Sequence, residues 1–187
     1  MRTLYRYILS DYGRYYGQPV NKFIGGVKAT INALFAVNHC FTYSFWLRVA
    51  SIKNPFQIIG ILMHRRLTRR YGIQIPRKTK IGYGFYIGHG VGIIINGGTI
   101  IGNNCNISQF LTIGTNKRTP AVIGDNVYIG PSVCIVENVN IGNNSSIGAG
   151  SVVVKDVPEN ATVAGVPAKV LNYDNPGRFV NRRYILS

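Results

Sequence analysis

An aliphatic residue recurs at every sixth position between residues 75 and 153, in three runs separated by short slips of phase. The recurring positions are Ile75, Ile81, Ile87 and Ile93, then Ile95, Ile101, Ile107 and Ile113, then Ile123, Ile129, Ile135, Ile141, Ile147 and Val153. Glycine often follows the aliphatic residue, which argues against a helix because each Gly costs about 1 kcal/mol there. The period of six favours a parallel β-helix, in which short strands alternate with tight turns and one aliphatic side chain per strand points inward.

The two slips of phase indicate where the repeat is interrupted. Two extra residues stand between Ile87 and Ile95, directly after His89. Four extra residues stand between Ile113 and Ile123, so residues 114–122 are expected to protrude as a loop. Insertions in solenoids are frequent sites of function.

The positive charge is concentrated before the repeat. The 187-residue chain has a formal net charge of +15, and residues 1–80 contain 14 of its 21 basic residues but only one acid, Asp11. Such a balance predicts a polyanionic partner, whether phospholipid, nucleic acid or a phosphorylated substrate. No recognised nucleic-acid-binding motif accompanies the charge, so nucleic acid is not expected as a partner.

The cysteines and the N-terminus indicate a cytoplasmic protein. Cys40, Cys105 and Cys134 are scattered without the spacing of metal ligands, so they are interpreted as reduced thiols and no metal is expected. The N-terminus lacks the pattern of a secretory signal. Residues 29–47 carry no formal charge, but polar side chains dilute the segment and it is not expected to cross a membrane.

Residues 1–73 contain no hexads and are expected to be helical, with Pro55 as a break. Two interpretations remain open. In the first, apolar residues of this region cap the open end of the solenoid; they are Phe41, Phe45, Leu47, Ile52, Phe56, Ile59, Leu62, Met63 and Leu67. In the second, the region also touches the anionic inner face of the cell membrane. Arginines and aromatics would make that contact: Arg65, Arg66, Arg69, Arg70, Tyr5, Tyr7, Tyr12, Tyr15, Tyr16, Phe41, Tyr43, Phe45 and Trp46.

Two stretches resemble a known family. They are GFYIGHGVGIIINGGTIIGNNCNISQFLTIG, which begins at Gly84, and IGAGSVVVKDVPENATVAGVPAKVL, which ends at Leu171. Residues 75–171 resemble the hexapeptide-repeat acyltransferases, and most of all their serine acetyltransferase branch, which includes many O-acetyltransferases of capsule and exopolysaccharide assembly. The resemblance implies a mainly β protein, a left-handed parallel β-helix with an α-helical N-terminal segment. The expected divisions are a basic helical region (1–73), the hexapeptide-repeat domain (74–171) and a C-terminal tail (172–187).

The same resemblance implies a site. His89 falls on the family's catalytic histidine, and an imidazole is suited to take a hydroxyl proton at neutral pH. Acetyl-CoA would be the co-substrate, in a groove between the subunits of a homotrimer. Its pantetheine is expected near Thr115, Pro131 and Ala149, and its phosphates near Lys155 and Lys169. His39 and His64 are interpreted as packing or interface residues.

Two positions depart from the serine enzymes of the branch. Gly88 stands where they have Asp before the catalytic histidine, and Thr119 stands where they have a second histidine. Arg118 is retained and is expected to contact an anionic group of the acceptor. With no carboxylate beside His89 in the sequence, Asn96 or a backbone carbonyl is expected to orient the imidazole at the acceptor site.

The sequence is therefore interpreted as that of an acetyl-CoA-dependent O-acetyltransferase of surface-polysaccharide biosynthesis. The enzyme would acetylate a sugar hydroxyl, and its acceptor would be a sugar or a lipid-linked glycan. One alternative is a serine O-acetyltransferase of cysteine biosynthesis, which the departures at Gly88 and Thr119 disfavour. An alternative of another class is a non-catalytic hexapeptide-repeat scaffold or binding subunit, which His89 disfavours.

Overall fold

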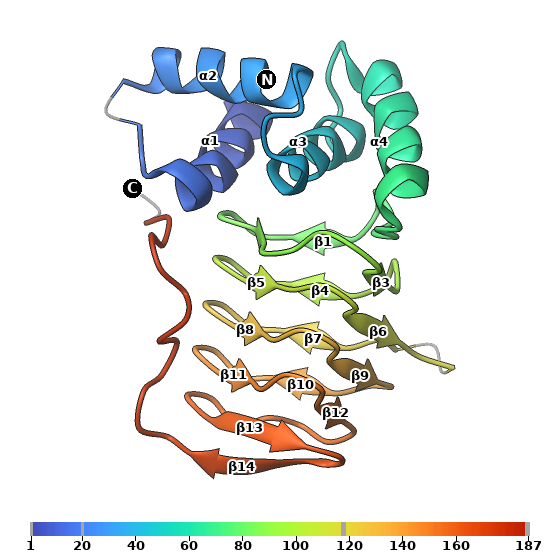
Figure 1. Cartoon of the computed structure of the whole chain (residues 1–187), viewed down its shortest axis with the longest axis vertical. Helices are drawn as coiled ribbons and strands as arrows, with labels where there is room; N and C mark the ends of the chain where they lie inside the picture. Colours follow the sequence, from blue (N-terminus) through green and yellow to red (C-terminus); the bar gives the residue numbers. More distant parts are fainter. Residues whose placement is uncertain (1, 20, 117–118, 186–187) are drawn as a thin grey trace.

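The computed structural model describes residues 2–19, 21–116 and 119–185. A layer of helices, here called the cap, lies on one end of a β-solenoid (Figure 1). The helices within the described ranges are α1 (Arg2–Tyr16), α2 (Lys22–Leu34), α3 (His39–Ser51) and α4 (Gln57–Tyr71).

The solenoid has three faces in the described part of the chain, and each coil from β1–β3 to β10–β12 contributes one short parallel strand to each face. The first face contains β1 (Lys80–Ile81), β4 (Ile100–Ile101), β7 (Val122–Ile123) and β10 (Asn140–Ile141). The second contains β2 (Tyr86–Ile87), β5 (Asn106–Ile107), β8 (Tyr128–Ile129), β11 (Ser146–Ile147), β13 (Thr162–Gly165) and β14 (Ala168–Asn172). The third contains β3 (Ile94–Ile95), β6 (Thr112–Gly114), β9 (Cys134–Val136) and β12 (Val152–Val153). β14 pairs antiparallel with β13 at the far end.

The aliphatic hexad positions form the solenoid core. On the first face Ile81 pairs in register with Ile101, and Ile101 with Ile123. The corresponding residues of the other two faces stack in the same way, and all are buried. The parallel β-helix expected from the repeat is confirmed, and both slips of phase fall in connections between faces.

Asparagines stack at one corner of the solenoid. Asn104, Asn126, Asn144 and Asn160 all have positive φ, between 55° and 63°. Asn126 donates from Nδ2 to Asn144 Oδ1 at 3.0 Å, and Asn144 donates to Asn160 Oδ1 at 3.1 Å. Asn tolerates the left-handed conformation better than most residues, so it suits these turns.

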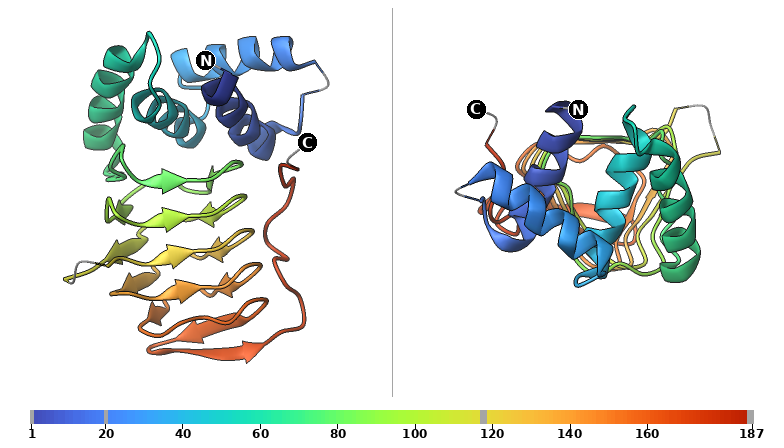
Figure 2. Two further views of the ribbon diagram at one scale, coloured as in Figure 1. Left: turned by 180° about the vertical axis from the view of Figure 1, so that it is seen from behind. Right: turned by 90° about the horizontal axis from the view of Figure 1, so that it is seen from above.

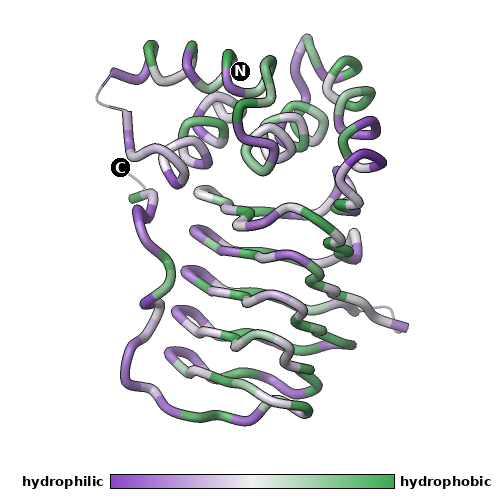
Figure 3. Tube along the Cα trace, in the orientation of Figure 1, coloured by the Kyte–Doolittle hydropathy of each residue, from purple (hydrophilic) through white to green (hydrophobic). Residues whose placement is uncertain are grey.

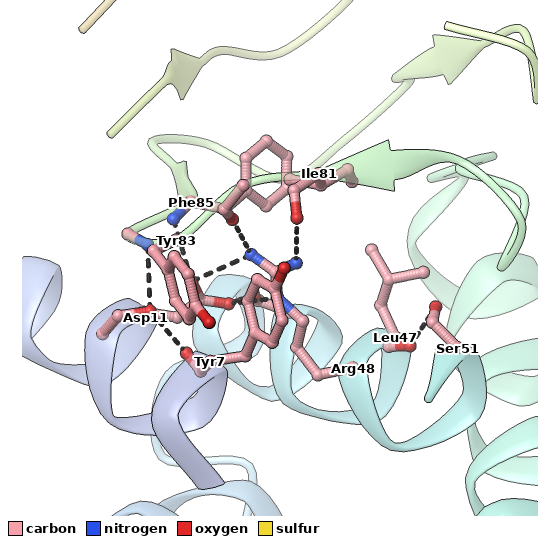
Figure 4. A network of polar contacts seen from close by, with 12 residues as sticks. Tyr7, Asp11, Leu47, Arg48, Ser51, Ile81, Tyr83 and Phe85 are labelled. Carbon is pink, nitrogen blue, oxygen red and sulfur yellow. Dashed lines mark hydrogen bonds and ion pairs between the residues drawn. The ribbon is translucent and has the colours of Figure 1, made fainter. Parts of the chain in front are cut away.

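The cap is joined to the first coil by a buried ion pair (Figure 4). Asp11 of α1 accepts hydrogen bonds at 2.8 Å from Nε of Arg48 and from the backbone N of Phe85. Arg48 of α3 donates in turn to the carbonyls of Ile81 at 2.7 Å and Gly82 at 2.6 Å. The pair therefore links two helices to the same coil of the solenoid.

The C-terminal tail returns along the outside of the coils to the cap (Figure 2). Asn106 donates to the carbonyl of Phe179 at 3.0 Å, and Asn104 donates to the carbonyl of Tyr184 at 3.1 Å. Arg14 of α1 donates to the carbonyl of Asn181 at 3.0 Å. The tail thus connects separate coils to α1, a path that the sequence analysis does not foresee.

Two expectations for the cap are wrong. The α3 aromatics Phe41, Tyr43 and Trp46 are buried, because α3 is covered by its neighbours in the cap and by the solenoid, so they do not reach a membrane surface. Phe56, Ile59 and Leu62 are exposed rather than packed in the cap, because they lie on the outer side of α4. No helix in the described ranges is both long and apolar enough to cross a membrane.

Candidate active site

His89 lies in the connection between β2 and β3, and its side chain is exposed. The backbone on either side is fixed to the next coil. Gly88 N donates to the carbonyl of Ile107 at 2.8 Å, and the carbonyl of Val91 accepts from Phe110 N at 3.0 Å. The imidazole is therefore presented to solvent from an ordered turn.

The partly buried Tyr15 and the buried Cys40 of the cap hold this turn from the opposite side. The Tyr15 hydroxyl accepts from the backbone N of Ile87 at 2.9 Å and donates to its carbonyl at 3.1 Å. Cys40 Sγ accepts from Gly90 N at 3.2 Å and lies 3.7 Å from the carbonyl of Gly88. Burial raises the pKa of Tyr15 and of Cys40, so both stay protonated and can donate at neutral pH. The sequence analysis did not identify Cys40 as a contact of this turn, and no local pattern links it to residues some fifty positions away.

The imidazole of His89 makes no hydrogen bond to any residue in the described ranges. Asn96 does not orient it, because Asn96 Oδ1 accepts from Gly98 N at 2.9 Å within its own turn. Gly88, where the family's serine enzymes have Asp, is uncrowded. A Cβ there would meet its nearest atom, the Ile107 carbonyl oxygen, at 3.6 Å.

Pro131 and Ala149 lie below His89 in the same corner of the solenoid. This corner joins the second face to the third, and its turns are hydrogen-bonded to one another along the solenoid axis. Ser132 N donates to the Gln109 carbonyl and Gly150 N to the Pro131 carbonyl, both at 2.9 Å. With coils about 4.8 Å apart, about 14 Å separates the His89 coil from the Ala149 coil. A Cβ added at Gly150 would meet nothing within 4 Å, so the backbone at the lower end is open to a ligand.

The remaining candidate residues lie elsewhere on the solenoid. Thr115 Oγ1 donates to Glu137 Oε2 at 3.0 Å, which fixes the start of the 114–122 loop. Lys155 follows β12, Lys169 belongs to β14, and both are exposed. Arg118 lies outside the described residues. The sequence analysis missed Glu137, although an acid in so basic a chain was a usable signal.

A recess of about 610 Å³ opens beside the His89 turn. Gly90 and Val91 form one wall, and His39, Arg70 and Tyr71 of the cap form the other. The Arg70 guanidinium gives the recess a positive charge. The structure thus brings His39 beside the His89 turn, whereas the sequence analysis expected a packing or interface residue.

The third histidine, His64, is a buried residue of the cap, as expected. Its Nε2 lies 2.9 Å from the hydroxyl of Tyr43. That hydroxyl donates to the carbonyl of Ile73, also at 2.9 Å, so Nε2 must be the donor in the pair with His64. Burial lowers the pKa of His64, consistent with a neutral imidazole.

Known proteins share both the repeat and the fold. Residues 120–155 match the family model "Bacterial transferase hexapeptide (six repeats)". The matched segment lies within the solenoid, after β6 and through β12. It is 39% identical over 105 residues to the serine acetyltransferase of Synechococcus elongatus, a match that covers 54% of this chain and 43% of that protein. It is 27% identical over 181 residues to the serine acetyltransferase of Buchnera aphidicola from Acyrthosiphon pisum, covering 88% of this chain and 66% of that protein.

Solved structures of serine acetyltransferases extend the similarity to the cap. The serine acetyltransferase of Neisseria gonorrhoeae in complex with serine matches with a TM-score of 0.69 and 27% identity, over 91% of this chain and 70% of that one. The Vibrio cholerae serine acetyltransferase matches with a TM-score of 0.73 and 21% identity, over 95% of this chain and 70% of that one. These neighbours confirm the left-handed parallel β-helix with an N-terminal helical segment. The chain spans about two fifths to two thirds of the length of the curated relatives described above.

The sequence interpretation of a sugar acceptor is wrong. It rested on side chains that are absent at Gly88 and Thr119, whereas the curated relatives and solved structures described above are serine acetyltransferases. The structure gives a physical reason why the missing Asp does not argue against serine as acceptor. Gly88 is uncrowded, and the turn around His89 is held by backbone bonds and by Tyr15, so a missing carboxylate leaves the geometry of the turn unchanged.

Proposed function

We propose that this chain is a serine O-acetyltransferase, which transfers the acetyl group of acetyl-CoA to the hydroxyl of L-serine. The observation that carries the proposal is the exposed His89 on a turn that is held by the cap on one side and by the next coil on the other. The similarity to serine acetyltransferases suggests serine as the acceptor and acetyl-CoA as the donor.

In the proposed reaction His89 acts as a general base. It takes the hydroxyl proton of serine as the oxygen attacks the thioester carbonyl, and the C–S bond then breaks. The proton passes from His89 to the departing thiolate, so the products are O-acetylserine and free CoA. General-base help of this kind is typically worth about 10²–10⁴-fold in rate.

The corner below His89 suits the donor. An extended pantetheine arm can follow the column of turns past Pro131 and Ala149, where exposed backbone groups are available for hydrogen bonds. Lys155 and Lys169 lie at the opposite end of the solenoid from His89, which suits ion pairs with the phosphates. A homotrimer, in which a second subunit completes the groove, is part of the proposal.

The recess beside the turn suits the acceptor. Arg70 supplies a positive charge for the carboxylate of serine, and Gly90 and Val91, which follow His89 directly, line the recess. The cap therefore forms one wall of the proposed acceptor site, while the solenoid supplies the base and the donor groove.

The experiment measures free-thiol release from acetyl-CoA with L-serine, and with a panel of sugars as the comparison. We expect release with serine and a loss of about 10²–10⁴-fold in kcat for His89→Ala. Because His89 is exposed, the melting temperature of this variant should match wild type. Unchanged turnover in His89→Ala would show that another group is the base. Absence of release with serine, in a protein that binds acetyl-CoA, would refute the proposed acceptor.

A further inference from the structure

Helix α2 is amphipathic in the opposite sense to a normal surface helix. Its inward side consists of small residues, with Gly25, Ala29 and Ala33 among those buried. Its large apolar residues point to solvent: Phe23, Ile24, Val27, Ile31, Leu34 and, just beyond the helix, Phe35 and Val37. Phe23 is 76% exposed and Leu34 is 62% exposed. The helix packs on its neighbours through its small side and presents its apolar side outward.

Helix α4 also presents apolar residues to solvent. Phe56, Ile58, Ile59 and Leu62 are exposed on its outer side, near the end of the helix that is remote from the solenoid (Figure 1). Figure 3 shows this end of α4 as hydrophobic and the end nearer the solenoid as hydrophilic. These residues of α2 and α4 together are here called the apical surface. Both helices pack on α3. Single exposed apolar residues are normal, but several on each of two helices of the same cap indicate a binding surface.

The charges near the apical surface are all positive. Arg65, Arg66, Arg69 and Arg70 follow on the outer side of α4, and Lys22 and Lys28 are exposed on α2. The one acid in residues 1–72 is Asp11, which is buried against Arg48 and contributes no negative surface. At 1.5 Å per residue, Arg66 lies about 10 Å along α4 from Ile59, toward the solenoid.

We propose that the apical surface docks on an anionic lipid bilayer. Apolar groups of interfacial helices enter the boundary between headgroups and acyl chains by about 5–10 Å. The apolar residues of α2 and the first turns of α4 would occupy that depth, and the arginines one to two turns further along would lie at the level of the phosphates. The chain would bind peripherally, with the solenoid directed away from the bilayer.

A second copy of the chain is the main competing occupant, and the charge distribution disfavours it. Face-to-face packing would bring two sets of lysines and arginines together with no exposed acid on either cap to pair with them. An anionic bilayer supplies both the apolar layer and the negative charge.

The test is co-sedimentation of the full chain with phosphatidylcholine vesicles, with and without phosphatidylglycerol, at rising salt. We expect binding to the anionic vesicles that weakens as salt increases. Phe23→Ser with Leu34→Ser should abolish it. Replacing Arg65, Arg66 and Arg69 with Gln should weaken it by about fivefold per charge, or on the order of a hundredfold together.

Matched controls use exposed residues at other positions. Leu171→Ser, at the far end of the solenoid, and Lys80→Gln, on β1, should bind vesicles like wild type. All variants should keep the wild-type melting temperature, because each replaced side chain is exposed. Absence of vesicle binding by wild type would overturn the proposal. A loss of vesicle binding in Leu171→Ser as large as that in Phe23→Ser with Leu34→Ser would overturn it as well. A concentration-dependent dimer that Phe23→Ser with Leu34→Ser dissolves, without vesicle binding, would assign the surface to a second copy instead.

Discussion

The buried pair between Asp11 and Arg48 provides a direct test of how the cap is attached to the solenoid. In Asp11→Ala, the Arg48 guanidinium stays buried but loses its carboxylate, while Ser44 Oγ and the backbone N of Phe85 lose their acceptor. The carbonyls of Ile81 and Gly82 remain as hydrogen-bond acceptors for Arg48, and the Tyr7 ring still lies 4.5 Å from its guanidinium carbon.

The expected loss of stability follows from these contacts. Removing one partner of a buried ion pair typically costs about 3–5 kcal/mol, because the other charge is left without compensation. For a chain of this size, 1 kcal/mol corresponds to about 2–4 °C in melting temperature. Asp11→Ala should therefore melt about 10 °C below wild type, and added salt should change the difference little because the pair is shielded from solvent.

The assay is urea and thermal unfolding followed by circular dichroism. Asp11→Leu combined with Arg48→Met is the comparison, because it removes both charges and keeps apolar volume. We expect the double variant to be more stable than Asp11→Ala. Two results would refute the argument that an uncompensated charge destabilises the cap. One is a loss of stability below about 1 kcal/mol for Asp11→Ala. The other is a double variant whose loss of stability equals the sum of the losses in Asp11→Leu and Arg48→Met measured separately.

Three further predictions concern the site and the buried groups. Gly88→Asp should raise kcat/KM with serine severalfold by placing a carboxylate beside His89, whereas Gly88→Asn should not; an equal response of both variants would argue against a charge effect. Burial lowers the pKa of His64, so the unfolded chain protonates this imidazole at a higher pH than the folded chain does. The stability that neutral His64 contributes is therefore fully present above about pH 6.5 and declines as the pH falls below that value. Unfolding curves across this range should show a smaller decline in His64→Gln, and an identical decline would exclude His64 as the cause. A thiol reagent should modify the half-exposed Cys134 in the native protein but not Cys105, whose pKa burial raises to about 12, and Cys134→Ser should remove the fast reaction.

The resemblance of the repeat to a known family suggested an acceptor that the comparisons do not support. Gly88 and Thr119 do replace the Asp and the second His of the serine enzymes. Side chains that are absent from a motif nevertheless do not identify the acceptor when the turn that carries His89 is held by other groups. Tyr15 and Cys40 come from helices that are distant in the sequence, so their contact with this turn could not be derived from the motif.

The sequence by itself determined the solenoid, because each coil repeats the same local choice of an inward aliphatic residue followed by a tight turn. The period of six fixed the inward positions, and the slips of phase located the His89 turn and the 114–122 loop. Only the tertiary structure decided how the cap is used. The sequence does not show which apolar residues of the cap are buried and which are exposed. In the folded chain the side of α2 with small residues packs inward, and Phe23 and Leu34 are left in solvent. The path of the tail and the pairing of Asp11 with Arg48 are likewise long-range contacts, which a local pattern does not encode.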